Sequence, residues 1–138
     1  MTEPEYLIKS IGIIHSDLAG RDGAPKQGYA GAPDAWVEVY PAVAEGLEGI
    51  TAGAEIILIT WLHRAVRDRL RVHPRGDPTR PLTGVLATRS PDRPNPLGLH
   101  RVTVLEIAGN KLRVGPLEAI EGTPLIDIKP VLPQAQDS

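Results

Sequence analysis

The stretch that decides the fold is Arg101–Val114, which reads RVTVLEIAGNKLRV. Val102 and Val104 alternate with polar neighbours, a pattern typical of a strand with one solvated face. The dipeptide Gly109-Asn110 separates two apolar runs and predicts a tight hairpin turn. We therefore expect an antiparallel pair of strands here.

Short apolar runs separated by turn residues continue through the rest of the chain, which contains 14 Pro and 14 Gly. Such punctuation disfavours long helices. One or two short helices are expected, at Pro41–Leu47 and His63–Leu70. Seven short strands favour a mainly β fold, an antiparallel or mixed barrel or sandwich. The predicted strands are Tyr6–His15, Ala35–Tyr40, Glu55–Leu62, Leu82–Thr88, Arg101–Ala108, Lys111–Val114 and Leu125–Pro130.

The length of 138 residues fits one domain spanning 1–138, with residues 1–5 and 133–138 expected to fray. The chain has no Cys, which excludes disulfides, zinc–thiolate sites and cysteine nucleophiles. The acidic N-terminus does not resemble a signal peptide, and no apolar run is long enough to span a bilayer. We expect a soluble, cytoplasmic protein that does not contact membranes.

Charge is distributed unevenly, although the net charge is only −2. Residues 64–101 contain nine Arg and three Asp, a local charge of +6, and the remainder of the chain carries −8. This asymmetry indicates an anionic partner for the middle of the chain. The alternative is an ordinary solvated face with neighbouring carboxylates folded over it.

Common catalytic and nucleotide-binding motifs are absent from the sequence. It contains no G-x-G-x-x-G, no G-x-x-x-x-G-K-[ST], no G-x-S-x-G and no H-E-x-x-H. The four His, at positions 15, 63, 73 and 100, are scattered, and no metal site is expected.

The densest polar segment, residues 87–99, reads ATRSPDRPNPLGL. Its three Pro restrict the backbone and remove donors, so the segment cannot lie inside a sheet but is stiff. A stiff loop with two Arg, Ser and Asn forms a pre-organised binding surface. The alternative is a structural crossover.

Two other segments combine apolar strands with polar ends. In residues 120–130, IEGTPLIDIKP, the alternation places Asp127 and Lys129 on one face, opposite Ile126 and Ile128. In residues 56–65, IILITWLHRA, the polar pair His63-Arg64 follows a buried strand. Each pattern fits a site, and each also fits a solvated ion pair or the edge of a core.

These segments together resemble the TsaA/TrmO-like family. The similarity runs in order through IGIIHS (11–16), APKQG (24–28), WLHR (61–64), PLTGVLATRSP (81–91), RPNPLGL (93–99) and EGTPLIDIKP (121–130). The resemblance implies a compact, seven-stranded β-barrel-like fold, usually homodimeric. It implies S-adenosylmethionine in a cleft unlike the Rossmann type, and methylation of N6 of threonylcarbamoyl-adenosine beside the anticodon of tRNA.

The resemblance also implies which residues contact the cofactor. The family usually has Asp where Glu121 stands, and commonly an aromatic residue where Val131 stands. Larger members carry an added C-terminal domain, which we do not expect here. The implied cofactor contacts are Pro25, Lys26, Gln27, Leu62, His63, Arg89, Leu99, Glu121, Gly122, Thr123 and Pro124.

An adenine N6 amine must lose a proton during or after methyl transfer, so a nearby acceptor helps. Asp127 and Glu121 are the candidate catalytic acceptors, and either also suits the methionine ammonium. Arg89 suits the methionine carboxylate. For the substrate we expect phosphate contacts from Arg64, Arg75, Arg80 and Arg93, and stacking by Tyr29 ahead of Tyr6, Tyr40, Trp36 or Trp61. The alternative function is an S-adenosylmethionine-binding sensor or partner-binding module without methylation activity.

Overall fold

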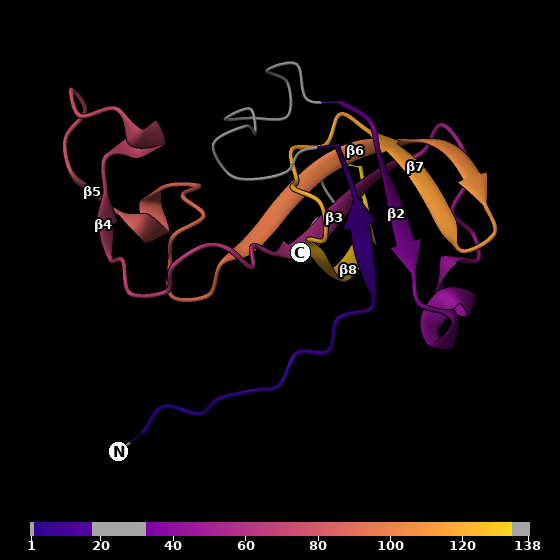
Figure 1. The fold of residues 1–138 in the computed structure, drawn as a ribbon, viewed down its shortest axis with the longest axis horizontal. Coiled ribbons are helices and arrows are strands. Elements are labelled where there is room, and N and C mark those ends of the chain that lie inside the picture. Colours follow the sequence, from indigo (N-terminus) through magenta and orange to yellow (C-terminus); the bar gives the residue numbers. More distant parts are fainter. Residues whose placement is uncertain (1, 18–32, 134–138) are drawn as a thin grey trace.

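The computed structural model describes residues 2–17 and 33–133 and is mainly β, as expected. Strands β1, β2, β7, β6, β3 and β8 form a closed barrel in that order, and every neighbouring pair is antiparallel. Figure 1 shows the barrel and, beside it, a projecting arm that carries β4 and β5. The barrel strands are β1 (Gly12–His15), β2 (Ala35–Val39), β3 (Glu55–Trp61), β6 (Leu97–Ala108), β7 (Lys111–Gly115) and β8 (Pro124–Pro130).

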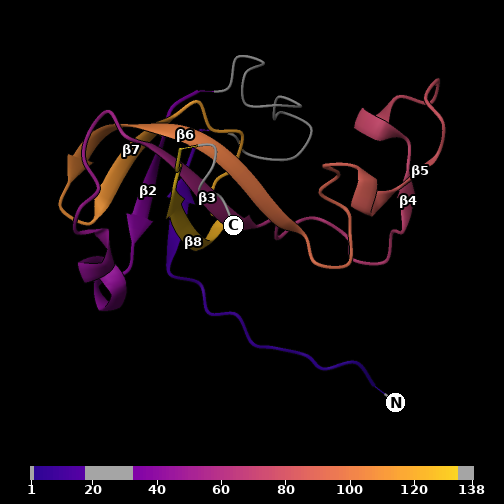
Figure 2. The ribbon, with the colours of Figure 1, turned by 180° about the vertical axis from the view of Figure 1, so that it is seen from behind.

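The arm comprises residues 62–96, between the end of β3 and the start of β6, and it extends away from the barrel in both views (Figures 1 and 2). It contains a two-stranded sheet of β4 (Arg71–Val72) and β5 (Thr83–Gly84). Two short 3₁₀ helices complete it, η3 (Pro74–Gly76) and η4 (Val85–Ala87). The strongly basic part of the sequence therefore lies mostly on this projection.

The inward-facing side chains of the barrel strands form one apolar core. Ile14, Val37, Leu58, Val104 and Leu112 are fully buried in it. The predicted hairpin at Gly109-Asn110 is confirmed, since β6 and β7 pair up to Ala108↔Lys111. Gly109 has φ of 64°, a conformation that glycine adopts without steric cost.

The predicted strands match the barrel closely, with one exception. In place of a strand at Leu82–Thr88, the chain forms only the short β5 and then η4. Six strands among the described residues therefore close the barrel, where seven were expected. The first predicted strand is also shorter, because Tyr6 and Leu7 are exposed and β1 begins at Gly12.

Of the two predicted helices, only Pro41–Leu47 forms, as the 3₁₀ helix η2. The predicted helix at His63–Leu70 is wrong: these residues form turns and bends. Val66 and Leu70 are 41% and 70% exposed among the described residues, so a helix here would bury little apolar surface through them. Short helices depend on such packing for most of their stability.

Candidate functional site

The turn from Glu121 to Pro124 is fastened to the end of β1 by backbone hydrogen bonds. The N–H of Gly122 donates to the carbonyl of Ile14, and the N–H of Ile14 donates to the carbonyl of Thr123, both at 2.9 Å. The buried Thr123 hydroxyl donates to the carbonyl of Ile120 at 2.7 Å. Thr123 thus shapes the turn from inside, and the turn presents Glu121 at the surface.

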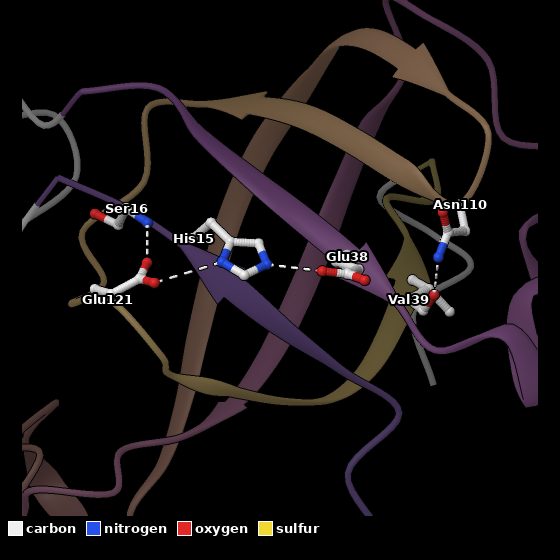
Figure 3. A network of polar contacts seen from close by, with 6 residues as sticks. All are labelled: His15, Ser16, Glu38, Val39, Asn110 and Glu121. Atoms are coloured by element: carbon white, nitrogen blue, oxygen red, sulfur yellow. Dashed lines mark hydrogen bonds and ion pairs between the residues drawn. The ribbon is translucent and has the colours of Figure 1, made fainter.

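A chain of polar groups runs outward from this turn (Figure 3). One carboxylate oxygen of Glu121 accepts the backbone N–H of Ser16 at 2.7 Å, and the other lies 3.4 Å from Nδ1 of His15. Nε2 of His15 lies 2.8 Å from the Glu38 carboxylate on β2. The imidazole is therefore held between two carboxylates from distant parts of the sequence.

Hydrogen bonds within this chain shift the pKa values of His15 and Glu121. The hydrogen bond to Glu38 is the main cause that raises the pKa of His15 above 6.5, despite some opposing desolvation. The hydrogen bond from the Ser16 N–H is the main cause that lowers the pKa of Glu121. Glu121 is consequently an anion near neutrality, and His15 holds its proton more strongly than a free imidazole does.

An open depression of about 520 Å³ lies directly beside this network. His15, Ser16 and Glu121 line it together with Trp36 on β2 and Arg113 on β7. Its size is within the usual range of about 300–1,000 Å³ for small-molecule sites. The depression is therefore the candidate site for a ligand that meets the Glu121 turn.

Other predicted cofactor residues gather at the same end of the barrel through strand register. Thr60 pairs with Leu125 of β8, and Ile59 pairs with Leu99 of β6. This brings Leu99, Leu62 and Pro124 to the end of β3. Leu99 is 52% exposed, and the Leu62 side chain lies over Gly98, within 3.0 Å of where a Cβ would stand. His63 follows Leu62 directly and is exposed.

Arg89 lies on the arm, exposed, just after η4. Within residues 2–17 and 33–133, no hydrogen bond or ion pair joins Arg89 to the barrel. The structure therefore gathers the predicted cofactor residues of the barrel at one end and leaves Arg89 on the projection. Pro25, Lys26, Gln27 and Tyr29 lie outside the described residues.

Two arginines of the arm, Arg67 and Arg93, stabilise the proline-rich loop (residues 87–99) by hydrogen bonds to its carbonyls. Nη1 of Arg93 donates to the carbonyls of Thr88 and Ser90 at 2.9 and 3.1 Å. Arg67 donates to the carbonyl of Pro94 at 2.7 Å and stacks over the Trp61 ring, 5.3 Å from its centroid. Arg93, predicted to contact phosphate, thus supports the loop, whereas Arg64, Arg75 and Arg80 are exposed on the arm.

Asp127 lies elsewhere on the barrel. It shares a face with Lys129, as predicted, with Oδ2 3.5 Å from the ammonium, and its Oδ1 accepts the N–H of Ile128 at 2.8 Å. It lines a separate depression of about 490 Å³ beside η2, together with Val43 and Leu47. The two predicted proton acceptors, Asp127 and Glu121, therefore do not line one pocket.

Sequence reasoning gave no role to four residues of the candidate site and its supports, namely His15, Glu38, Arg67 and Arg113. His15 stands in a motif that carried the family resemblance, but no spacing rule links it to Glu38. Their contact depends on the β1–β2 register, in which Ile13 pairs with Glu38 and His15 with Trp36. The alternation in Ala35–Val39 was a usable signal, since it turns Trp36 and Glu38 outward.

In 2–17 and 33–133, no group of three or more His, Asp or Glu side chains is placed to hold a metal ion. No helix among those residues has the length and apolar character needed to cross a bilayer.

Comparisons with known proteins point to one family. The family model described as the tRNA-methyltransferase O N-terminal domain matches residues 13–137. An S-adenosyl-L-methionine-binding protein of Archaeoglobus fulgidus is 39% identical over 128 residues, which are 93% of this chain and 91% of that protein. A protein of Methanothermobacter thermautotrophicus, named as a probable S-adenosyl-L-methionine-binding protein, is 40% identical over 130 residues, 94% of this chain and 93% of the relative.

Solved structures with the same fold extend this similarity. The crystal structure of TrmO from Pseudomonas aeruginosa superposes with a TM-score of 0.75 at 26% sequence identity and covers 98% of this chain. This chain spans only 60% of that crystal structure's length.

Proposed function

The chain belongs to the family of tRNA-methyltransferase O N-terminal domains, and we propose that it is an S-adenosylmethionine-dependent methyltransferase acting on tRNA. The proposed acceptor is N6 of threonylcarbamoyl-adenosine beside the anticodon. The observation that carries the proposal is the family match across residues 13–137, together with relatives of nearly the same length that are named for S-adenosylmethionine binding.

The described residues fit a ligand of this chemistry. S-adenosylmethionine carries a sulfonium and an ammonium, and Glu121 offers a carboxylate whose lowered pKa keeps it charged. Exposed Leu99 and the neighbouring Leu62 offer apolar surface at the end of β3. The hydroxyl of Thr123 is engaged with Ile120, so Thr123 contributes shape rather than a side-chain hydrogen bond. Arg89 lies on the arm and forms no hydrogen bond or ion pair with the barrel among the described residues, so its contact with the methionine carboxylate stays a prediction.

S-adenosylmethionine, when bound, supplies a methyl group already activated by its positive sulfur. The residues of the chain then need to position the acceptor and take up a proton from N6. A carboxylate with a lowered pKa is a poor base, so Glu121 suits the binding of a cation better than proton transfer. His15 lines the same depression, and the hydrogen bond with Glu38 raises its pKa above the ordinary 6.5, which makes it a stronger base than Glu121, so we assign proton uptake to His15.

Glu38 has a supporting role in this mechanism. Its carboxylate lies 2.8 Å from Nε2 of His15 and fixes the orientation of the ring, which leaves Nδ1 toward Glu121 and the depression (Figure 3). A base that is held in one orientation loses less entropy on reaching the transition state. Glu38 also stabilises the imidazolium that proton uptake creates.

The arm supports the choice of a polyanionic substrate. Arg64, Arg75 and Arg80 are exposed on it, and Arg69 and Arg71 are exposed nearby. Lys and Arg side chains on such a projection bind phosphates with a strong dependence on salt. This charge lies away from the Glu121 turn, as expected if the arm holds the RNA backbone while the barrel holds the reacting groups.

The homodimer implied by the family resemblance stays a prediction. It is supported by large apolar side chains that the arm exposes, Leu70 at 70%, Leu82 at 55% and Leu86 at 82%. Large apolar side chains gain stability when a second copy covers them and removes them from water. Sedimentation equilibrium tests it: Leu86→Glu should shift the protein toward monomer if these residues are buried by a second copy. The cytoplasmic location expected from the sequence also stays a prediction.

Calorimetry and a methylation assay test the proposed function together. S-adenosylmethionine should bind, and tRNA carrying threonylcarbamoyl-adenosine should gain one methyl group on that nucleoside by mass spectrometry. tRNA lacking the modification is the control. Binding of S-adenosylmethionine without transfer to any tRNA would favour the sensor or partner-binding module instead.

A further inference from the structure

Three side chains form a row across the outer face of the barrel. The register pairs His15 of β1 with Trp36 of β2, and Trp36 in turn with Arg113 of β7. The residues next to them in sequence, Ile14, Val37 and Leu112, are buried in the core. Because side chains alternate along a strand, His15, Trp36 and Arg113 point outward. Trp36 thus lies between an imidazole and a guanidinium on three adjacent strands.

Both flanking groups of the row are held by carboxylates. His15 lies 2.8 Å from Glu38 and 3.4 Å from Glu121. On the other side, Nη1 of Arg113 donates to Asp34 at 2.8 Å and its Nε donates to Glu106 at 3.2 Å. These contacts fix two long side chains beside the indole. Fixed groups lose little conformational freedom when a ligand arrives.

The residues that line the depression, and their charges, restrict the kind of ligand that can bind there. His15, Trp36 and Arg113 all line the depression of about 520 Å³. Asp17, Asp34 and Glu121 also line it, so carboxylates outnumber the cationic groups. This composition disfavours a phosphate beside Trp36 and favours a flat heterocycle that offers donors to the carboxylates and acceptors to Arg113.

We propose that Trp36, flanked by His15 and Arg113, is the platform on which the acceptor adenine base stacks before methylation. Adenine presents a donor at N6 beside a ring nitrogen acceptor, and N6 keeps one N–H after threonylcarbamoylation. These groups match the carboxylates and the Arg113 guanidinium that line the depression together with Trp36. The inference rests on the proposed function, since the stacked base is its acceptor. It also places the N6 amine beside His15.

The second tryptophan of the chain provides a matched control. Trp61 is half-buried and ends β3, as Trp36 is half-buried on β2. Arg67 of the arm lies over the Trp61 ring, which therefore already has a stacking partner. Trp61→Leu leaves Trp36 as the sole tryptophan, so its fluorescence reports directly on the platform.

The experiment measures nucleoside binding independently of methyl transfer. In Trp61→Leu, adenosine and N6-threonylcarbamoyl-adenosine should quench Trp36 fluorescence saturably, whereas ribose 5-phosphate should not. In the otherwise wild-type chain, Trp36→Leu should weaken nucleoside affinity, measured by calorimetry, on the order of tenfold. Trp36→Phe, which keeps a ring, should retain most of the affinity. S-adenosylmethionine affinity should be unchanged in both variants.

Three results would overturn the platform. They are no saturable quenching by either nucleoside, equal nucleoside affinity in Trp36→Leu and wild type, or a loss of S-adenosylmethionine affinity in Trp36→Leu, which would assign the ring to the cofactor. Circular dichroism confirms that each variant is folded, and Trp36→Phe keeps the test available if Trp36→Leu is not. A chain that binds nucleoside at Trp36 but transfers no methyl group would refute the proposed function alone.

Discussion

The carboxylate of Glu121 accepts a hydrogen bond from the backbone N–H of Ser16 at 2.7 Å, across 105 residues of sequence. This contact joins the turn before β8 to the residue that follows β1. It orients Glu121 toward the depression that His15 and Trp36 also line. The site therefore depends on a hydrogen bond between segments near the N-terminal and C-terminal ends of the barrel.

Replacing Glu121 with Gln should weaken S-adenosylmethionine binding by about tenfold, because a neutral amide loses the charge-assisted attraction for a cationic ligand. The amide oxygen still accepts the Ser16 N–H, so the turn should persist. Calorimetry measures the affinity. Glu45→Gln, at an exposed position of η2, is the control and should bind normally. Equal affinity in both variants would remove Glu121 from the cofactor site.

The pKa of His15 should lie above 6.5 in the folded protein, because Glu38 stabilises the imidazolium. Stability contributed by the protonated ring is present below about pH 6.5 and is lost as the pH rises through the folded-state pKa. The effect on stability should be small, since 42% of the side chain is exposed to solvent. NMR titration of the imidazole protons measures this pKa.

Glu38→Gln should lower the pKa of His15, since it removes the main cause of the shift. If His15 takes up the proton from N6, methyl transfer rises as His15 deprotonates, and the rising limb of the pH–rate profile should move to lower pH in Glu38→Gln. A pH–rate profile that does not follow the NMR titration would show that another group takes up the proton.

The stability contributed by His100, on β6, should depend on pH in the opposite direction to that contributed by His15. Burial lowers its pKa to about 4, and its Nε2 lies 2.9 Å from the Thr60 hydroxyl. The unfolded chain binds a proton here near pH 6.5 and the folded chain does not, so stability is present above pH 6.5 and is lost as the pH falls toward 4. The loss is on the order of 3 kcal/mol.

Urea unfolding at several pH values measures this loss. His100→Gln keeps a partner for Thr60 but cannot titrate, so its stability should fall much less between pH 6.5 and 4. Equal acid sensitivity in the variant and the wild type would show that His100 is not the group responsible.

The missing side chain of Gly98 leaves space for the side chains of Thr60 and His100. A Cβ added there would meet the Thr60 hydroxyl, and His100 Nε2 at 2.8 Å. Gly98→Ala should therefore destabilise the fold by about 1–3 kcal/mol through overpacking. Gly46→Ala, which would meet nothing within 4 Å, should leave stability nearly unchanged. A matching loss in both variants, measured by thermal unfolding, would contradict the crowding argument.

Exposed arginines of the arm should contribute to tRNA affinity without selecting a sequence. Arg80→Ala should weaken tRNA binding and reduce the slope of log affinity against log salt by about one unit or less. Arg101→Ala is the comparison and should change the slope less, because Arg101 lies on β6 of the barrel and not on the arm; both arginines have a carboxylate partner, Asp77 at 4.0 Å for Arg80 and Glu55 at 3.1 Å for Arg101. Filter binding at several salt concentrations distinguishes the two. An unchanged slope in Arg80→Ala would show that the arm does not hold the phosphates.

Local pattern predicted most of the barrel. Short apolar runs between turn residues predicted β2, β3 and β7, and the alternation around Val102 and Val104 predicted β6. The predicted helix at His63–Leu70 failed for a tertiary reason: Val66 and Leu70 lie on the arm, where the other described residues leave both side chains exposed. The order of residues shows the apolar periodicity, but it does not show whether another element covers the apolar side chains.

The site was predictable only in part. Motif resemblance identified the Glu121 turn, and the structure fastens that turn to β1. The pairing of His15 with Glu38 and the row through Trp36 depend on strand register, which a slip of one residue would invert. Arg93 could not be distinguished from a phosphate ligand by sequence, because only the folded loop brings the carbonyls of Thr88 and Ser90 to its guanidinium.

The most direct test of the central claim is a methyl-transfer assay with the purified chain, S-adenosylmethionine and tRNA that carries threonylcarbamoyl-adenosine. Nucleoside mass spectrometry should find one added methyl group on N6 of that residue, and His15→Ala should reduce the rate by about 100-fold or more while it still binds S-adenosylmethionine. The account would be contradicted if S-adenosylmethionine binds tightly and no adenosine in the tRNA gains a methyl group.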